Sequence, residues 1–356
     1  MAAPINKTMT LITTTLYNVI FFNDSVKDIA IAHKTYHHTY EPNKKIKIQN
    51  DNGNYTIITN SLGFKDEGII EIKKNIDKKR IVLIGDSFTE GVLLNFEKTF
   101  AGIFKNYLSN QNIDLLNAGR GGYSPIIYWA KIKNLIEVEN LNFDELYVFI
   151  DLSDTWDEYN TFDLDNNQNV VMKNPPKNKQ IVEENFIGKS KIFLKKNTFL
   201  TYLALNYFYD VFINNSENKI WYSYVINNVH FDKWPIEKQA YDAWGHEGIK
   251  LQKTYMDKLK NILDKNNIKL TVVVYPWISQ IWYEDLNSLH VDIWKDWSKE
   301  NNSDFINLFP SFVKKNISDV EKDKIIDENF IKGDFHFNEK GNKIIAEVLI
   351  DNFEKR

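Results

Sequence analysis

A Gly-Asp-Ser sequence at residues 85–87 is the first feature of this chain whose residue types could support chemistry. It directly follows residues 81–84, an aliphatic run typical of a strand that is buried on both faces. Ser87 would then lie where a parallel strand turns into its crossover helix, the edge at which open α/β sheets bind ligands. Backbone N–H groups and the positive end of that helix would favour a developing negative charge. The alternative is a purely structural helix cap, because Ser and Asp are both favoured caps.

Asp334 and His336, near the other end of the chain, supply the two groups that a serine nucleophile needs. The histidine would take the serine proton, and the aspartate would orient the imidazole and favour its cation. Both residues come just before an amphipathic segment that we expect to be the last helix. Ser87, Asp334 and His336 therefore form a candidate catalytic triad in chain order.

The order of these motifs resembles that of the SGNH, or GDSL-type, hydrolase superfamily over roughly residues 80–353. The resemblance implies an acyl-enzyme on Ser87 and an oxyanion bound by the backbone N–H groups of Ser87 and Gly119. The third family motif, Gly-x-Asn-Asp, reads Asp-Leu-Ser-Asp at residues 151–154. Ser153 thus stands in for the asparagine that is a further oxyanion donor in the family.

The last motif also departs from the common family pattern, because Asp334 lies two residues before His336 and Gly333 occupies the usual aspartate position. This Asp-x-His spacing resembles the variant found in bacterial polysaccharide O-acyltransferases and esterases. The resemblance implies an O-acyl substrate, in particular an O-acetyl group on a carbohydrate. It also favours a bacterial protein that acts outside the cytoplasm or next to a membrane.

These residues leave three functions open. A serine-dependent O-acyl ester hydrolase would pass the acyl group to water, whereas an O-acyltransferase would pass it to a glycan hydroxyl with the same residues. The third is a glycan-binding module with weakened catalysis, because Ser153 is shorter than the asparagine of the family. Neither enzyme requires a metal or a dissociable cofactor.

Polar and aromatic residues next to the expected catalytic edge are candidates for substrate binding. They are Asp86, Asn117, Asp154, Trp277 and Gln280.

His33 and His37 are four residues apart and would share one face of a helix, which is a zinc-like spacing. Lys34 stands where a His-Glu-x-x-His motif has its glutamate, so we expect no metal there. These histidines are expected to pack in the fold or to contact polar groups of a substrate.

Alternating apolar runs and amphipathic segments predict a flavodoxin-like three-layer α/β/α fold with a five-stranded parallel sheet. Strands are expected at residues 81–84, 113–116, 146–150, 270–275 and 305–309. Helices are expected at residues 96–108, 125–137, 249–263 and 344–353. Residues 1–79 would form an N-terminal extension packed on the catalytic domain, residues 80–356.

An aromatic-rich helical insertion is expected at residues 155–248, between the third and fourth strands. Residues 199–213 are apolar on nearly every face, which predicts a buried helix too short to span a bilayer. Aromatic rings there would either pack on the core or form a wall for a sugar acceptor.

Composition excludes some partners. Lys and Arg number 44 against 48 Asp and Glu, and the resulting net charge of −4 speaks against nucleic acid. The chain has no cysteine, which excludes disulfides and thiol catalysis. Residues 9–22 are moderately apolar but shorter than the roughly 20 residues of a membrane span. We expect a packed helix there, with membrane proximity as the alternative.

Overall fold

The computed structural model describes residues 29–50, 53–173, 222, 226 and 230–356. The apolar segment 9–22 and the expected buried helix at 199–213 lie outside the described residues. Within the described part of the chain, no helix is both long enough and apolar enough to cross a membrane.

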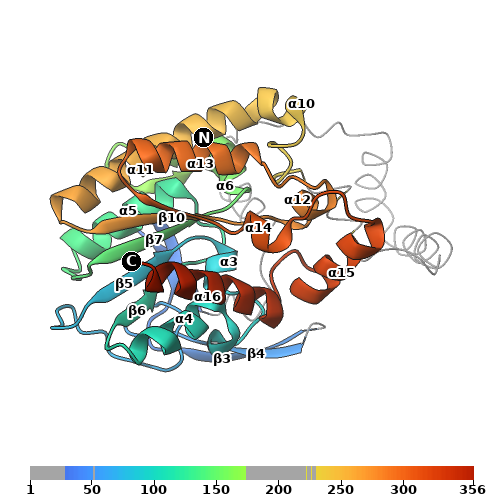
Figure 1. Cartoon of the computed structure of the whole chain (residues 1–356). Helices are drawn as coiled ribbons and strands as arrows, with labels where there is room; N and C mark the ends of the chain where they lie inside the picture. The colour runs from blue at the N-terminus through green and yellow to red at the C-terminus, as the bar shows by residue number, and fades with distance from the viewer. Residues whose placement is uncertain (1–28, 51–52, 174–221, 223–225, 227–229) are drawn as a thin grey trace, which may run out of the picture.

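A five-stranded parallel sheet forms the centre of the molecule, with the order β11-β10-β7-β5-β6 (Figure 1). The strands are β5 (Arg80–Ile84), β6 (Asp114–Asn117), β7 (Glu145–Ile150), β10 (Lys269–Val274) and β11 (Asp304–Asn307). Every residue of β5 and β7 is buried, as expected for strands that are covered on both faces. In chain order the sheet reads 2-1-3-4-5, so the predicted flavodoxin-like fold class is confirmed.

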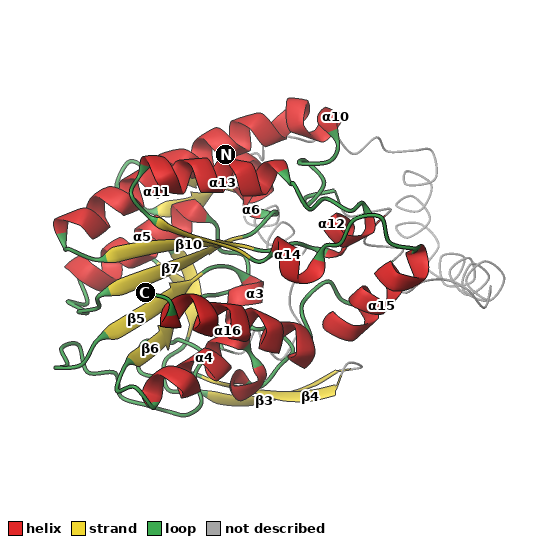
Figure 2. Ribbon diagram, in the orientation of Figure 1, coloured by secondary structure: helices red, strands yellow, loops and turns green. Residues whose placement is uncertain are grey.

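Helices cover both faces of this sheet (Figure 2). On one face α4 (Phe100–Ser109) packs against α16 (Glu339–Glu354). The other face carries α5 (Pro125–Glu137), α11 (His246–Lys265) and α13 (Leu289–Glu300). Amphipathic spacing explains the positions of α4, α11, α13 and α16, because each turns an apolar stripe to the core. Most residues of α5 are buried, since α11 and β9 also pack against it. Short helices complete the core domain: α3 (Ser87–Glu90), η1 (Phe96–Lys98), α12 (Ile278–Trp282), α14 (Phe309–Phe312) and α15 (Asp319–Asn329).

Two β-hairpins precede the sheet. β1 (Ala30–His33) pairs with β2 (His37–Tyr40), and β3 (Lys45–Asn50) pairs with β4 (Gly53–Ile58). Tyr40 belongs to a small apolar cluster of this region.

The prediction that His33 and His37 share a helix face is wrong, because the two residues lie opposite each other on paired strands. The backbone N–H of Thr35 donates to His33 Nδ1 at 3.2 Å and helps to close the turn between them. A spacing of four residues marks one face only where the backbone is helical.

The described parts of the insertion pack mainly against α11, and β9 also contacts α5. The chain passes from α6 (Asp154–Trp156) through a π-helical turn, η2 (Asp157–Thr161), into the hairpin of β8 (Phe162–Leu164) and β9 (Val170–Met172). It returns through α10 (Lys238–Ala240) and a second π-helical turn, η4 (Tyr241–Gly245), which leads into α11. The Trp156 ring lies 5.2 Å from the Trp244 ring and 5.7 Å from the Phe231 ring, measured between centroids. Domain boundaries at residues 79 and 248 stay a prediction.

Candidate active site

Ser87 is the first residue of helix α3, just beyond the carboxyl end of strand β5. The Asp86 side chain caps this helix, because it accepts a hydrogen bond from the backbone N–H of Phe88 at 2.9 Å. Glycine is needed at position 85, since a Cβ atom on Gly85 would lie 2.1 Å from the Thr89 hydroxyl oxygen. Asp86 is therefore the structural cap, and the hydroxyl of Ser87, which is also 3.2 Å from Asp86 Oδ2, is not needed as a cap.

His336 is the second partner of the Ser87 hydroxyl. Its Nε2 atom lies 2.8 Å from Ser87 Oγ, although 249 positions separate the two residues. On the other side of the ring, Nδ1 lies 2.5 Å from Asp334 Oδ1. The backbone N–H of His336 also donates to Asp334 Oδ1 at 2.9 Å, so the Asp-x-His spacing closes a tight turn around the carboxylate. The structure thus brings the three predicted triad residues together in one hydrogen-bonded row.

The segment that carries His336 is held on both sides. Asn338 caps helix α16 through hydrogen bonds from the backbone N–H groups of Lys340 and Gly341. The Phe88 ring, next to the serine, lies 4.6 Å from the imidazole between centroids. Aromatic packing and the helix cap together fix the position from which the imidazole reaches Ser87.

The electrostatics of the histidine and aspartate support each other. Burial alone would lower the pKa of His336, but the charge of Asp334 and its hydrogen bond raise that pKa above its ordinary value. Burial would raise the pKa of Asp334, yet the attraction of His336 holds it below its ordinary value. The pair therefore favours an imidazolium beside a carboxylate, the state that forms when histidine has taken the serine proton.

Of the two backbone N–H groups expected to bind an oxyanion, one has no acceptor within its helix and the other is already hydrogen-bonded. The N–H of Ser87 is at the first position of α3, where no intrahelical acceptor exists. The N–H of Gly119 instead donates to Asn117 Oδ1 at 3.1 Å. The other end of the Asn117 amide donates to the carbonyl of Thr89 at 2.7 Å, so Asn117 holds the loop to α3. The oxyanion role of Gly119 stays a prediction.

Ser153, the third expected donor, is engaged as well. Its hydroxyl oxygen lies 2.5 Å from Asp151 Oδ1, and its backbone N–H donates to the same oxygen at 2.7 Å. If Asp151 is ionised, the Ser153 hydroxyl donates its hydrogen bond to Asp151 and has no hydrogen left for an oxyanion. The role of Ser153 toward an oxyanion therefore depends on the state of Asp151.

Gly122 was not among the expected donors. It has a positive φ of 76°, and its backbone N–H has no hydrogen-bond acceptor among the described residues. The preceding N–H, of Gly121, donates to Glu90 Oε2 at 2.7 Å, which ties this part of the loop to α3. The Gly-Gly pair at residues 121–122 is the sequence signal for a turn that needs a positive φ.

Three buried carboxyl groups, of Asp86, Asp151 and Asp154, lie beside the triad. One oxygen of each lies within 4.8 Å of the others, a spacing that could hold a metal ion. Asp86 accepts a hydrogen bond from Tyr275 at 3.0 Å, Asp151 from Trp277 at 2.6 Å, and Asp154 from Tyr128 at 2.9 Å. Burial raises the pKa of all three, that of Asp86 to about 8. The pKa shifts fit carboxyl groups that keep protons better than they fit metal ligands, although the three hydrogen-bond donors act in the opposite direction.

Trp277 and Gln280 follow strand β10, as expected, but both are buried. The Trp277 ring stacks on Phe335 with centroids 4.6 Å apart and therefore supports the triad segment. The Gln280 amide accepts from the backbone N–H of Trp277 at 3.0 Å and donates to the carbonyl of Asp232 at 2.6 Å. Substrate contacts of these residues stay a prediction.

A buried ion pair joins helix α3 to the loop that follows β6. Glu90 Oε2 lies 2.8 Å from Arg120 Nη1, and both side chains are at most 2% exposed. Tyr40, from the N-terminal hairpin, donates its hydroxyl to Glu90 Oε1 at 2.5 Å. His38 Nε2 lies 2.9 Å from the carbonyl oxygen of Gly121. No sequence motif marks this contact, through which the N-terminal extension reaches the loop next to the triad.

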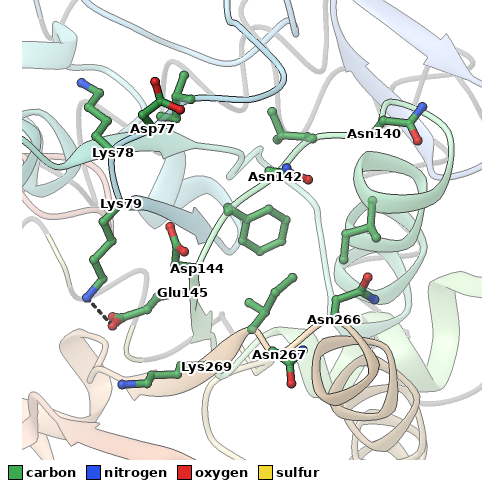
Figure 3. Close-up of a pocket in the computed structure, with 15 residues that line it drawn as sticks. Asp77, Lys78, Lys79, Asn140, Asn142, Asp144, Glu145, Asn266, Asn267 and Lys269 are labelled. Atoms are coloured by element: carbon green, nitrogen blue, oxygen red, sulfur yellow. Dashed lines mark ion pairs between the residues drawn. The ribbon is translucent and has the colours of Figure 1, made fainter.

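A separate cavity of about 930 Å³ opens at the opposite edge of the sheet, near the starts of β5, β7 and β10 (Figure 3). Its walls include Lys79 and Glu145, which form an ion pair at 2.6 Å. None of the predicted site residues lines this cavity.

Neither a family model nor a curated protein matches this chain. Solved structures do resemble it. A psychrotrophic esterase from Pseudoalteromonas sp. is 10% identical with a TM-score of 0.40, covering 78% of this chain and 98% of its own. A GDSL-like lipase from Bacteroides thetaiotaomicron is 13% identical with a TM-score of 0.40, covering 80% and 92%. A catalytic mutant of an acetylxylan esterase from Geobacillus stearothermophilus is 12% identical with a TM-score of 0.40, covering 78% and 95%.

Proposed function

We propose that this chain is a serine-dependent O-acyl ester hydrolase of the SGNH type. The observation that carries the proposal is the row formed by Ser87, His336 and Asp334, with distances of 2.8 Å and 2.5 Å. A serine hydroxyl in contact with an oriented imidazole is the arrangement that activates a serine nucleophile.

In the proposed reaction, Ser87 Oγ attacks the ester carbonyl carbon while its proton passes to His336 Nε2. The tetrahedral intermediate collapses when the carbon–oxygen bond to the alcohol breaks and His336 returns the proton to that alcohol. Water then attacks the acyl group on Ser87 in the same way and releases the acid. Asp334 holds the imidazole and stabilises its cation in both steps.

For the substrate, we propose an O-acyl group, in particular an O-acetyl group, on a carbohydrate. Support comes from the resemblance of the Asp-x-His motif and from the half-buried rings of Trp156 and Phe231, which lie 5.7 Å apart. Aromatic rings of this kind stack on sugar faces. Transfer of the acyl group to a glycan hydroxyl would use the same residues, and the experiment below separates the two reactions.

A fluorophosphonate probe, which reacts with activated serines, tests the proposal. We expect the wild-type protein to be labelled, and Ser87→Ala and His336→Ala to lose labelling and the hydrolysis of p-nitrophenyl acetate. Ser109→Ala, in an exposed helix end, is the matched control and should behave as wild type. Labelling that persists in a folded Ser87→Ala protein would contradict the proposal.

The fate of the acyl group is measured in the same system with an acetylated xylo-oligosaccharide as donor. Free acetate as the main product, with and without an unacetylated glycan, supports the hydrolase. Acetylated acceptor in excess over acetate would instead assign a transferase.

A further inference from the structure

Helix α3, which begins with the candidate nucleophile Ser87, is a single turn of four residues. One helical turn is not stable by itself, because too few hydrogen bonds follow to repay the cost of forming it. Contacts from outside α3 must therefore hold Ser87 at its distance from His336. The Asp86 cap holds the start of this turn, and contacts from other elements hold its end.

A chain of three hydrogen bonds runs from helix α5 to the end of α3. Lys131 Nζ, on α5, donates to the carbonyl of Ala118 at 3.0 Å. The backbone N–H of Gly119 donates to Asn117 Oδ1 at 3.1 Å. The amide of Asn117 donates in turn to the carbonyl of Thr89 at 2.7 Å. The chain therefore ends within the turn that begins with the nucleophile.

The middle of this chain is one peptide unit. The carbonyl of Ala118 and the N–H of Gly119 belong to the same planar trans peptide and point to opposite sides of it. A donor that fixes the carbonyl therefore fixes the direction of the N–H as well, and with it the amide of Asn117. All donors in the chain point the same way, so each bond polarises the next. Lys131 thus acts on α3 through the loop that follows β6.

Lys131 is fully buried, which is a rare environment for a lysine. Its Nζ lies over the rings of Phe64, Tyr123 and Tyr36, at 4.6, 4.8 and 5.4 Å from the ring centroids. Within the described part of the chain, no carboxylate forms a salt bridge with it. Burying an amine costs more than burying an apolar side chain of similar size. What a lysine adds at this position is the pair of hydrogen bonds that its amine donates.

The second of these hydrogen bonds connects Lys131 to the N-terminal hairpin. Its Nζ lies 3.1 Å from the hydroxyl oxygen of Tyr123. That hydroxyl donates to the carbonyl of His38, on β2, at 2.7 Å. One amine therefore holds both ends of the loop at residues 118–123 and joins them to the hairpin.

We propose that Lys131 is a positioning residue for α3, the turn that carries the nucleophile. Through the peptide unit after Ala118 and the amide of Asn117, it holds the end of α3 and so keeps Ser87 Oγ in place for attack. Lys131 itself contacts neither the substrate nor the reacting atoms. This inference rests on the proposed ester hydrolase function.

Lys131→Met, which keeps an unbranched side chain but removes its donors, tests the proposal. Misplacement of a reacting atom by about 1 Å costs on the order of 10²-fold, so we expect kcat for p-nitrophenyl acetate to fall roughly 10- to 100-fold. KM should stay the same, and the rate of fluorophosphonate labelling of Ser87 should fall as well. Wild-type kcat and labelling rate in a folded Lys131→Met protein would overturn the proposal.

Lys105→Met is the matched control for the loss of a largely buried lysine. Lys105, on α4, binds Asp66 at 2.5 Å and takes no part in the chain. This variant should lower the melting temperature and keep wild-type kcat. An equal loss of kcat in Lys105→Met and Lys131→Met would assign the effect to general destabilisation and contradict the proposal.

A double-mutant cycle with Asn117→Leu tests whether the effect travels through the chain. Asn117→Leu breaks the chain near its end, so Lys131→Met should change kcat little further in this background. Equal fold losses in both backgrounds would show that Lys131 acts by another route. If Lys131→Met does not fold, Lys131→Gln, whose amide ends one bond short of Nζ, replaces it with the same expected results.

Ser87→Ala separates this inference from the function on which it rests. Activity that persists in Ser87→Ala would show that the ester hydrolase proposal itself has failed. Loss of activity in Ser87→Ala, together with wild-type kcat in Lys131→Met, would remove only the positioning role of Lys131.

Discussion

At the scale of residues, the contact of His336 with Asp334 makes the histidine a stronger base than burial alone would allow. The carboxylate accepts both the ring N–H and the backbone N–H of His336, so it fixes the ring orientation as well as its charge. Orientation and basicity are both needed for the imidazole to take the Ser87 proton.

We predict that kcat/KM of wild type falls on the acid side with a midpoint above pH 6.5, the ordinary pKa of histidine. The base must be neutral, and a raised pKa keeps His336 protonated to higher pH. Asp334→Asn should move this midpoint to lower pH and reduce kcat on the order of 10⁴-fold, because the tautomer and orientation are lost. Steady-state kinetics between pH 5 and about 9 measure both changes. If the midpoint in Asp334→Asn equals that of wild type, Asp334 does not raise the pKa of His336.

The triad could be predicted from the sequence because its residue types and chain order are specific to the chemistry. The oxyanion donors could not. Whether the N–H of Gly119 is free depends on the Asn117 rotamer, and whether the hydroxyl of Ser153 is free depends on a buried proton. Sequence patterns do not report either property.

At the scale of elements, the N-terminal hairpins contact the machinery beside the triad. Tyr40 donates to Glu90, which in turn binds Arg120 and the N–H of Gly121. A hydrophobic pattern predicts a strand, but it does not predict that a tyrosine on that strand will satisfy a buried carboxylate. The helices of the core were predictable because a 3.6-residue period is local, whereas this contact joins residues 50 positions apart.

We predict that Tyr40→Phe destabilises the protein by about 1–3 kcal/mol, because a buried carboxylate loses one hydrogen-bond donor. The same change should lower kcat, since Glu90 holds the loop that carries Gly121. Urea unfolding and steady-state kinetics measure the two effects. Tyr55→Phe is the matched control in the same apolar cluster and should leave kcat unchanged. An equal loss of kcat in both variants would show that general packing, and not the Glu90 contact, is responsible.

We predict that Gly119→Ala lowers kcat more than KM, because the added Cβ atom would lie 2.7 Å from the Thr89 side chain and must push the loop away from α3. Gly68→Ala is the control, since its Cβ would meet Ile70 only at an ordinary distance of 3.7 Å. Comparison of kcat, KM and melting temperature for both variants tests this. Wild-type kcat in a folded Gly119→Ala would show that the loop tolerates displacement.

At the scale of the whole molecule, buried acids with raised pKa values are concentrated between the catalytic edge and the insertion. Burial raises the pKa of Asp86 and Glu158 to about 8 and that of Asp157 and Asp232 to about 7. The folded protein therefore holds protons that the unfolded chain has already released at neutral pH. The overall charge of −4 gives no sign of this, because it counts residues and not their burial.

We predict that the free energy of unfolding falls as pH rises from 6.5 to 8, because the native state binds more protons than the unfolded state in this range. The raised pKa of His336 acts in the same direction. His33, His37, His38 and His290, whose pKa values are lowered, act in the opposite direction near pH 6.5, and their effect fades as the unfolded histidines lose their protons at higher pH. Lys65, with a pKa lowered to about 8, and Lys131, whose pKa is also lowered, each offset one acid at most. Urea unfolding at several pH values measures the slope.

Glu158→Gln should reduce that slope by at most about 1.4 kcal/mol per pH unit, the share of one group. The Glu158 side chain accepts from the backbone N–H of Ile126 at 2.6 Å, a bond that the amide oxygen of glutamine can keep. Glu97→Gln, at an exposed glutamate, should leave the slope unchanged. If Glu158→Gln and wild type give the same slope, Glu158 is already ionised at neutral pH, and the stability of the insertion must depend on pH through its other acids.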